Sequence, residues 1–515
     1  MILLAAAGQL ALERARVHGV RPPLLAAVAL AGSAILAVLA LRESDALPVP
    51  PRPFELPRFP RALYLACLPG TASLVLALLV YLAAPQRPAL SARLWLLGIA
   101  LLLIPGVVDW RRNAVRRSRD AKSESRRLAA AAALLFIIAF GVRIWAGIDR
   151  IPGWLDGDEA ATGLVGRKVF AEGFGALFGF WEMGNPNMTL FVSQLAAWPF
   201  GGDLLGLRLG SALLGSLSVV LLFDFGRRLV GASTAFVAGL LLSVNHAFLH
   251  YSRAGQIYVD TPFFASLLLA LLLRALTGGS FLALTGAGVV LGIGAATYVA
   301  TQILPAAIAA TLAGWAIILR WPSRRALQML GAVAAIALLV CAPMFATILR
   351  MPLEIAYQRI PTISLLRADG FRQLRDAYGG GSVPEALARH LGRTISIFNS
   401  GYDYFKAYGA TRALNDAVTA ALIPAAAALV VSRASSLLGW VSLMFTGVYV
   451  TAGVLLSPSP PTYHRILVVL LFSSLGVAWT LTGLARTLAA GLRVRQWLPA
   501  ALACAVVAAS AWLNL

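Results

Sequence analysis

The sequence predicts an all-α protein, a polytopic transmembrane helical bundle of about 14 spans with amphipathic helices along the outer membrane surface. Of its 515 residues, 59% are hydrophobic and only 13% are charged, and this charged fraction is about half of that in an ordinary soluble domain. The apolar residues form runs of roughly 17 to 22, long enough to cross a hydrocarbon core about 30 Å thick. Most of the arginines lie in short segments between these runs, as expected for membrane loops.

The apolar runs define the candidate spans in chain order. They lie at about 24–41, 62–84, 90–108, 128–147, 208–224, 231–249, 261–276, 280–298, 303–319, 328–346, 413–432, 435–456, 466–484 and 497–514. A further apolar stretch, Met188 to Phe200, has only about 13 residues and is bounded by prolines and glycines, which is too short for a span. We expect this stretch to lie flat on the membrane.

The basic residues predict the orientation. Residues 111–127 are strongly basic and are therefore expected in the cytoplasm, which places residues 148–207 outside. With 188–200 lying flat, the later basic groups all fall inside, whereas an extra span there would put them outside. The same count places the amino terminus outside although it carries Arg14, Arg16 and Arg21, which argues the other way. Because the basic residues are spread over loops, the net charge of +21 does not indicate a nucleic-acid partner.

The first outer loop carries three carboxylates within four positions, Asp156, Asp158 and Glu159. Either aspartate is a suitable N-cap for a helix that Gly173 ends. The amino end of a helix favours the ionised form of a carboxylate, and such a carboxylate can accept a proton from a hydroxyl. A single acid in this place is more often a solvated cap. Further along, Glu182 adds a fourth acid to the loop.

Other polar clusters are expected at the same membrane face, and they favour a site over isolated caps. One runs from Asn245 to Asp260 and contains His250 and Arg253, a second is Tyr298 with Thr301 and Gln302, and a third is Tyr463-His464-Arg465. Arg143 lies near the outer end of its span. Arginine suits a lipid phosphate because it offers a permanent charge and a fork of donors. The alternative for each arginine is snorkelling to the headgroups.

No metal site is predicted. The acids and histidines that could approach one another outside are Glu159, Glu182, His246, His250 and His464. No two of them have the tight spacing of metal ligands, and the three cysteines lie inside apolar runs. A divalent metal stays an open alternative to satisfied interfacial histidines.

Several of these motifs occur together in a known order. Asp158-Glu159, Pro186, the helix from Arg208 to Gly231 and Tyr251-Ser-Arg253 resemble the GT-C glycosyltransferases of the protein O-mannosyltransferase and lipid A aminoarabinose transferase type, glycosyltransferase families 39 and 83. The resemblance covers about residues 128–300 and is weaker at Tyr463-His464-Arg465.

The resemblance implies a polyprenyl-phosphate-linked sugar donor, an outward-facing site in a cell membrane (an inner or plasma membrane) and inversion at the anomeric carbon. It makes Asp158 the general base and matches Arg253 and Asp260 to a Ser-Arg pair and a second aspartate. Two features depart from it: the gap from Arg253 to Asp260 is wider than the family's, and Asn185-Pro186-Asn187 lacks the family's second proline and nearby lysine.

We therefore expect an inverting glycosyltransferase that moves a sugar from a polyprenyl-phosphate donor to an acceptor hydroxyl or phosphate on a protein, lipid or glycan. The catalytic candidates are Asp158, Glu159 and Asp260; the donor-phosphate candidates are Arg253, Arg465 and Arg143; the substrate-binding candidates are Asp156, Glu182, His250, Tyr298, Tyr463 and His464. The alternatives are a secondary transporter or lipid flippase, which would need mid-membrane ionisable residues and paired broken helices, and a catalytically inactive GT-C-like scaffold.

The expected organisation has four parts. Residues 1–127 form extra transmembrane helices with the basic cytoplasmic loop, and 128–346 form the catalytic core. Residues 347–412 are a long extracytoplasmic loop and 413–515 are the C-terminal transmembrane helices.

Overall fold

The structure of the protein is a computed structural model. It describes residues 1–17, 24–42, 57–115, 119–145, 147–148, 155–181, 185–318, 324–351, 364–367, 369–403, 413–491 and 498–514. These residues are almost entirely helical. Their one sheet is a short antiparallel pair, β1 (Phe180–Trp181) with β2 (Asn185–Pro186), in which Phe180 pairs with Pro186.

The helices follow one another with few long connections. In the first half they are α1 (Ile2–Val17), α2 (Leu24–Arg42), α3 (Arg61–Leu65), α4 (Leu68–Ala83), α5 (Pro88–Val115), α6 (Arg119–Ile144), α7 (Gly157–Ala171), α8 (Asn187–Ala197), α9 (Leu204–Val230), α10 (Ala232–Val244) and α11 (His246–Tyr251). In the second half they are α12 (Asp260–Gly278), α13 (Phe281–Ala295), α14 (Val299–Gln302), α15 (Leu304–Ile318), α16 (Arg324–Arg350), α19 (Gly370–Ala377), α20 (Val383–Ser396), α21 (Ala417–Ser432), α22 (Leu437–Val450), α23 (Val469–Gly491) and α24 (Leu498–Asn514). Short 3₁₀ turns include η1 (Gly173–Ala176), η3 (Trp198–Phe200), η4 (Ile257–Val259) and η7 (Tyr463–Arg465), and the π-helical turn η6 (Thr451–Leu455) extends α22.

The all-α membrane bundle predicted from the sequence is confirmed. Within the described residues, nine helical stretches are long and apolar enough to cross a membrane, and five shorter apolar helices accompany them. Each predicted span coincides with one of these helices or with a consecutive pair of them. The short apolar stretch at 188–200 forms α8 and η3. The chain is a multi-pass membrane protein, and the total number of spans stays a prediction.

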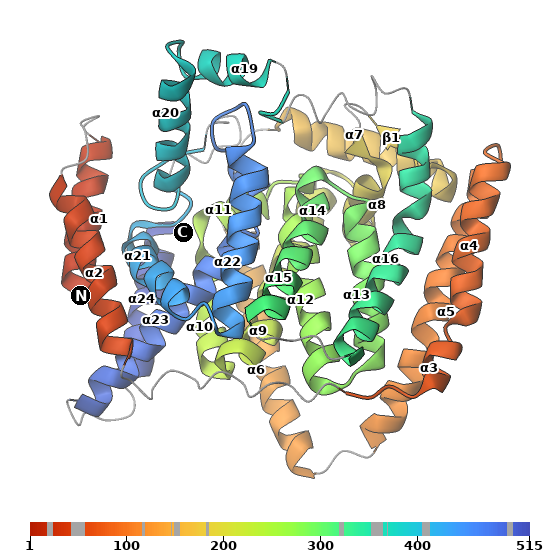
Figure 1. Cartoon of the computed structure of the whole chain (residues 1–515), viewed down its shortest axis with the longest axis horizontal. Coiled ribbons are helices and arrows are strands. Elements are labelled where there is room, and N and C mark those ends of the chain that lie inside the picture. The colour runs from red at the N-terminus through yellow and green to blue at the C-terminus, as the bar shows by residue number, and fades with distance from the viewer. Residues whose placement is uncertain are drawn as a thin grey trace.

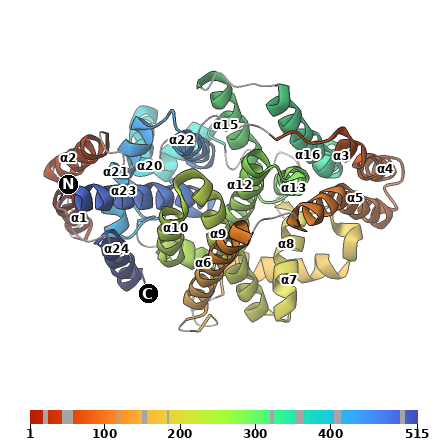
Figure 2. The same ribbon diagram turned by 90° about the horizontal axis from the view of Figure 1, so that it is seen from below.

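The first helices of the chain lie at opposite ends of the molecule (Figures 1 and 2). Helices α1 and α2 pack against α21, and α2 also contacts α23. Helices α4 and α5 instead pack against α16 and α13. Residues 1–127, which were expected as one unit, are therefore divided between the two ends of the bundle. The centre is formed by α9, which contacts α6, α8, α10 and α12.

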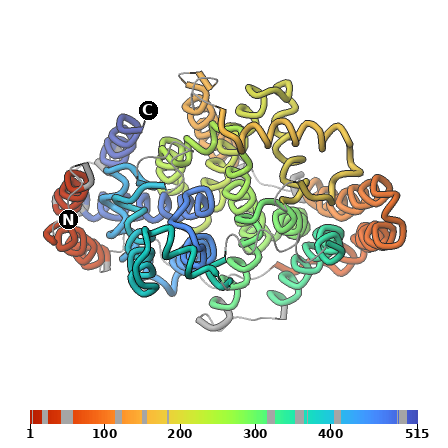
Figure 3. The backbone as a smooth tube through the Cα atoms, turned by 90° about the horizontal axis from the view of Figure 1, so that it is seen from above, coloured from red at the N-terminus to blue at the C-terminus, as the bar shows by residue number. Residues whose placement is uncertain are grey.

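The bundle has two opposite faces. Helix α7 lies across one end of the bundle, the end that faces the viewer in Figure 3, and α8 and α14 lie near the same end (Figure 1). We call this end the α7 face. The opposite face contains the end of α9, the start of α10 and the junction between α12 and α13 (Figure 1).

Candidate functional site at the α7 face

At the amino end of α7, the neighbouring carboxylates of Asp158 and Glu159 lie in two different environments. Asp156 caps the helix, and its Oδ1 accepts from the backbone N–H of Asp158 at 2.8 Å and from Gln256 Nε2 at 3.1 Å. Asp158 is exposed, and its Oδ2 accepts a hydrogen bond from the hydroxyl of Tyr258. Glu159, the next residue, is fully buried. Successive helix positions point about 100° apart, so one acid faces outward while its neighbour enters the core.

Glu159 is committed to a closed ion pair. Its two oxygens accept from Arg208 Nε at 2.7 Å and Nη2 at 2.8 Å, and Oε1 also accepts from the N–H of Gly255 at 2.7 Å. Arg208 is only 2% exposed and donates in addition to the carbonyl of Ile148 at 3.2 Å. A bidentate pair of this kind fixes both partners in position. It joins α7 to α9 and to the loop that follows α11.

Tyr258 connects the first outer loop to the C-terminal part of the chain. Its ring stacks on His464, with centroids 4.5 Å apart and planes at 27°. Tyr251 and Tyr298 contact the Tyr258 ring edge-on, with centroids 5.9 and 5.4 Å away. Next to His464, the side chain of Arg465 is half-buried and donates to Ser457 Oγ at 2.7 Å. Asp158 is therefore linked through Tyr258 to His464, the residue before Arg465, although more than 300 positions separate them in the sequence.

A second connection runs from α11 and η7 to the segment after α20. Tyr463 is fully buried, and its hydroxyl donates to the carbonyl of Gly401 at 3.3 Å. Tyr251 donates to Asp403 Oδ2 at 2.6 Å, and Asp403 is also fully buried. These contacts bring part of the segment predicted as a long extracytoplasmic loop against the site.

Arg253 donates most of its hydrogen bonds to the carboxyl end of α6. Its Nε donates to the carbonyl of Arg143 at 3.0 Å, and its Nη2 donates to the carbonyls of Val142 and Trp145. Cationic donors are favourable there because the last carbonyls of a helix lack partners and carry partial negative charge. The remaining nitrogen, Nη1, forms no hydrogen bond within the described part of the chain.

Arg143 is fully buried behind this cap. Its Nε donates to Ser252 Oγ at 2.8 Å, and its guanidinium lies 5.2 Å from the centroid of the Phe248 ring. Gly215 of α9 makes the close approach possible, because a Cβ there would lie 2.5 Å from Ser252 Cβ and 2.9 Å from Arg143 Nε. Arg143 thus fills a space between helices.

Asp260 begins α12 as a fully buried carboxylate. Neither of its oxygens has a hydrogen-bond partner among the described residues. Its neighbour Thr261 shares a hydrogen bond of 2.8 Å with Thr301 of α14. Burial of a carboxyl group without a partner is costly, so packing stability does not account for an acid at this position.

His250 is held in its neutral form. Burial lowers its pKa from 6.5 to about 4, with a further lowering by Arg253 and an opposing effect of Glu159. Its ring contacts Tyr251 edge-on at 5.3 Å. A neutral imidazole offers one donor and one acceptor, so His250 at neutral pH provides hydrogen bonds and no positive charge.

The structure adds residues that the sequence analysis did not select. Tyr258 stands within the predicted cluster 245–260, and an aromatic hydroxyl two positions before Asp260 was the available signal. Arg208 opens the helix motif of the predicted resemblance, but nothing in the sequence indicated its partner Glu159. The predicted residue Glu182 lies outside the described residues. Among the residues described, no three His, Cys, Asp or Glu side chains are grouped as metal ligands would be.

Comparisons with known proteins agree with the predicted resemblance. Residues 185–346 match the sequence profile of a family described as "Dolichyl-phosphate-mannose-protein mannosyltransferase". This match confirms, over that part of the chain, the resemblance to GT-C glycosyltransferases. Arg208, Arg253, Asp260 and Tyr298 lie inside the matched segment, whereas Asp158 and Arg465 lie outside it. No curated protein matches the chain.

Solved structures give matches of low identity. The archaeal oligosaccharyltransferase AglB from Archaeoglobus fulgidus, in complex with an inhibitory peptide and a dolichol-phosphate, is 13% identical with a TM-score of 0.48 over 76% of this chain. ArnT from Cupriavidus metallidurans, bound to undecaprenyl phosphate, is 16% identical with a TM-score of 0.47; the match covers 76% of this chain and 70% of that one. The chain spans 55% of the length of the AglB chain.

Proposed function

We propose that the protein is a glycosyltransferase that moves a sugar from a polyprenyl-phosphate carrier to an acceptor at the α7 face, with inversion at the anomeric carbon. The observation that supports this most directly is the arrangement around Tyr258. An exposed carboxylate, Asp158, is bonded to Tyr258 of a buried aromatic cluster at this face, and a cation, Arg465, directly follows His464 of the same cluster in the chain. A displacement at a sugar phosphate needs both groups, one to take a proton and one to stabilise the leaving phosphate.

In this mechanism Asp158 accepts the proton of the acceptor hydroxyl as that oxygen attacks the anomeric carbon. The Tyr258 hydroxyl donates to Oδ2 and orients the carboxylate, which lies exposed at the amino end of α7 where an acceptor can reach it. As the bond to phosphate breaks, negative charge grows on the departing polyprenyl phosphate. Arg465 and the remaining nitrogen of Arg253 stabilise this charge by charge-assisted hydrogen bonds.

The same geometry suggests positioning roles for two predicted site residues. Both oxygens of Glu159 are occupied inside the core, so we assign it the task of holding α7, and therefore Asp158, against the loop that carries Tyr258. Arg143 is buried and bonded to Ser252 and to the carbonyl of Ala139, and we assign it the task of supporting Arg253. His250, His464, Tyr298 and Tyr463 line or support the aromatic cluster as substrate-binding candidates.

Replacing the base tests the proposal. Asp158→Asn keeps the size of the side chain but cannot accept the proton, and loss of a general base costs about 10²–10⁴ in rate. The matched control is Asp203→Asn, because Asp203 is an exposed carboxylate that caps α9 through the N–H of Gly206, and asparagine caps equally well. Turnover is measured in proteoliposomes with labelled polyprenyl-phosphate mannose and a membrane extract that supplies acceptors.

We expect Asp158→Asn to lose kcat with little change in donor binding, and Asp203→Asn to match the wild type. Equal turnover of the two variants would remove Asp158 from the mechanism. Movement of the labelled lipid between leaflets without sugar transfer would favour a flippase, and donor binding without transfer or movement an inactive scaffold.

A further inference from the structure

A groove large enough for one acyl chain lies between helices α6, α9, α10, α23 and α24, away from the Asp158 site. Its volume is about 600 Å³. The walls are mainly apolar and include Ala131, Phe236, Leu240 and Val507. Two arginines, Arg127 of α6 and Arg486 of α23, also line it, and no acidic residue is among its lining residues.

Both arginines lie toward the opposite face of the bundle. Arg127 precedes Arg143, whose backbone carbonyl is bonded to Arg253 at the α7 face, by about 24 Å of helix. Arg486 follows the start of α23, which begins just after Arg465, by about 26 Å of helix. Each of these lengths of helix is comparable to the thickness of a hydrocarbon core, about 30 Å. The arginines belong to the leaflet that does not contain the Asp158 cluster.

The chemistry of the groove is that of an amphiphile with a negative head. Arg127 and Arg486 are both exposed, and Arg486 donates to Ser233 Oγ at 3.3 Å at the start of α10. Basic pockets between transmembrane helices recognise anionic lipid headgroups, because the charge acts at the depth of the phosphates while the chains enter the apolar part. A peptide segment would need partners for its backbone groups, which the apolar walls do not offer.

We propose that this groove binds an anionic phospholipid of the leaflet at the opposite face. One acyl chain lies along the walls formed by α6, α10 and α24, and the headgroup phosphate lies between Arg127 and Arg486 beside Ser233. This inference does not depend on the proposed transferase activity, because it uses other residues and the other leaflet.

A cysteine in the groove allows its occupancy to be measured. Cys504 lines the groove and is exposed, whereas Cys67 and Cys341 are buried. Alkylation of the purified protein by a maleimide in detergent therefore reports access to Cys504. We expect phosphatidylglycerol to slow this alkylation at lower concentrations than phosphatidylcholine does. Each arginine should contribute about fivefold to the apparent affinity for the anionic lipid, so Arg127→Gln with Arg486→Gln should weaken it about 25-fold.

Two further variants complete the experiment. Arg112→Gln removes an exposed arginine of α5 that does not line the groove and should leave the lipid protection of Cys504 unchanged. Ala131→Phe fills the groove and should reduce protection by both lipids. Equal protection by the two lipids, or an unchanged affinity in the double arginine variant, would overturn the proposal. Protection by polyprenyl phosphate in preference to phosphatidylglycerol would overturn the assignment of the occupant.

Discussion

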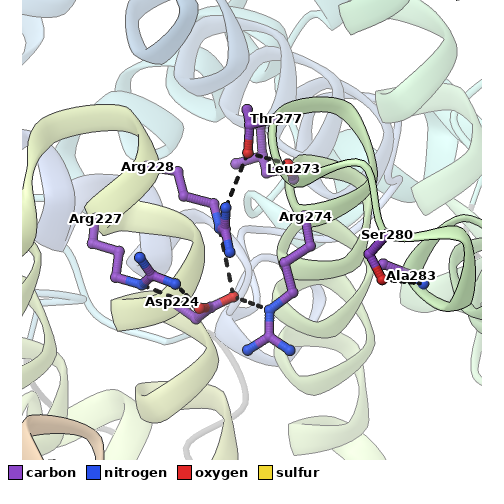
Figure 4. A network of polar contacts seen from close by, with 8 residues as sticks. All are labelled: Asp224, Arg227, Arg228, Leu273, Arg274, Thr277, Ser280 and Ala283. Atoms are coloured by element: carbon purple, nitrogen blue, oxygen red, sulfur yellow. Dashed lines mark hydrogen bonds and ion pairs between the residues drawn. The ribbon is translucent and has the colours of Figure 1, made fainter. Parts of the chain in front are cut away.

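Two clusters of arginine and carboxylate join α9 to its neighbours, one at each end of the helix. At the α7 face, Glu159 and Arg208 form a balanced pair whose side chains are 0% and 2% exposed. At the opposite face, one carboxylate, Asp224, faces three arginines: Arg227 at 2.9 Å, Arg274 at 2.8 Å and Arg228 at 4.0 Å (Figure 4). These arginines remain 19–48% exposed. The first cluster is closed and neutral, whereas the second keeps excess positive charge.

The comparison shows that the same kind of ion pair contributes differently to stability when it is buried and when it is exposed to solvent. A buried pair cannot replace a lost partner by water, so one removal leaves an uncompensated charge in the core. A half-exposed pair can exchange its partner for water or for a lipid headgroup, and its contribution is small.

Breaking the buried pair should have the largest effect on stability. Glu159→Gln leaves the Arg208 charge without its counter-ion, and we expect a loss of about 3–5 kcal/mol in the free energy of unfolding. Thermal unfolding of the purified protein measures it. Replacing Arg208 by methionine in the same chain removes the stranded charge, so the double variant should lose less than the sum of the two single losses. A strictly additive result would show that the two residues are not coupled.

Lowering the pH should reduce the free energy of unfolding because His250 is buried in its neutral form. Burial lowers the pKa of His250 from 6.5 to about 4, so the unfolded chain binds a proton that the folded protein excludes. Stability is therefore lost as the pH falls from about 6.5 toward 4, by a total of about 3 kcal/mol. Unfolding measured across this range should show a steeper slope for the wild type than for His250→Asn. Parallel curves would contradict the assignment.

Opening the opposite cluster should have the smallest effect. Arg274→Gln removes a side chain that is 48% exposed, and Asp224 retains Arg227 and Arg228. We expect a loss of about 1 kcal/mol or less, decreasing further in high salt because exposed charges are screened. Unfolding at low and high ionic strength provides the measurement. A loss as large as that of Glu159→Gln would remove the contrast between the two clusters.

Local features of the site followed from the sequence. Asp156 caps α7 as expected, and Gly173 follows the end of the helix with a φ of 72°, a conformation that glycine adopts without strain. The apolar runs predicted the helices because burial in a bilayer leaves a strong compositional signal. The sequence did not predict that Asp158 is exposed and Glu159 buried, because this depends on which side of α7 packs against α9. In this helix Leu164 is 72% exposed while Glu159 is fully buried, so the usual rule of apolar burial does not apply.

The long-range partners could not be inferred from one sequence. Glu159 and Arg208 are 49 positions apart, and no periodic pattern connects residues on different helices. Arg253 was predicted to face a lipid phosphate, but an arginine suits the carbonyls of a helix end equally well by its chemistry. Only the position of α6 in the structure shows that most donors of Arg253 bind the carbonyls at the end of that helix. The phosphate-binding role of Arg253 stays a prediction that depends on its remaining nitrogen.

The separation of α1 and α2 from α4 and α5 bears on how the molecule is assembled. Synthesis proceeds from the amino terminus, so α1 and the membrane span α2 are made early, whereas the surfaces of α21 and α23 that they contact appear near the end of translation. Until then the first pair has only lipid around it and must remain nearby as an undocked hairpin. Attachment of this pair is therefore a late event in biogenesis, and a chain truncated before α21 should leave it unattached.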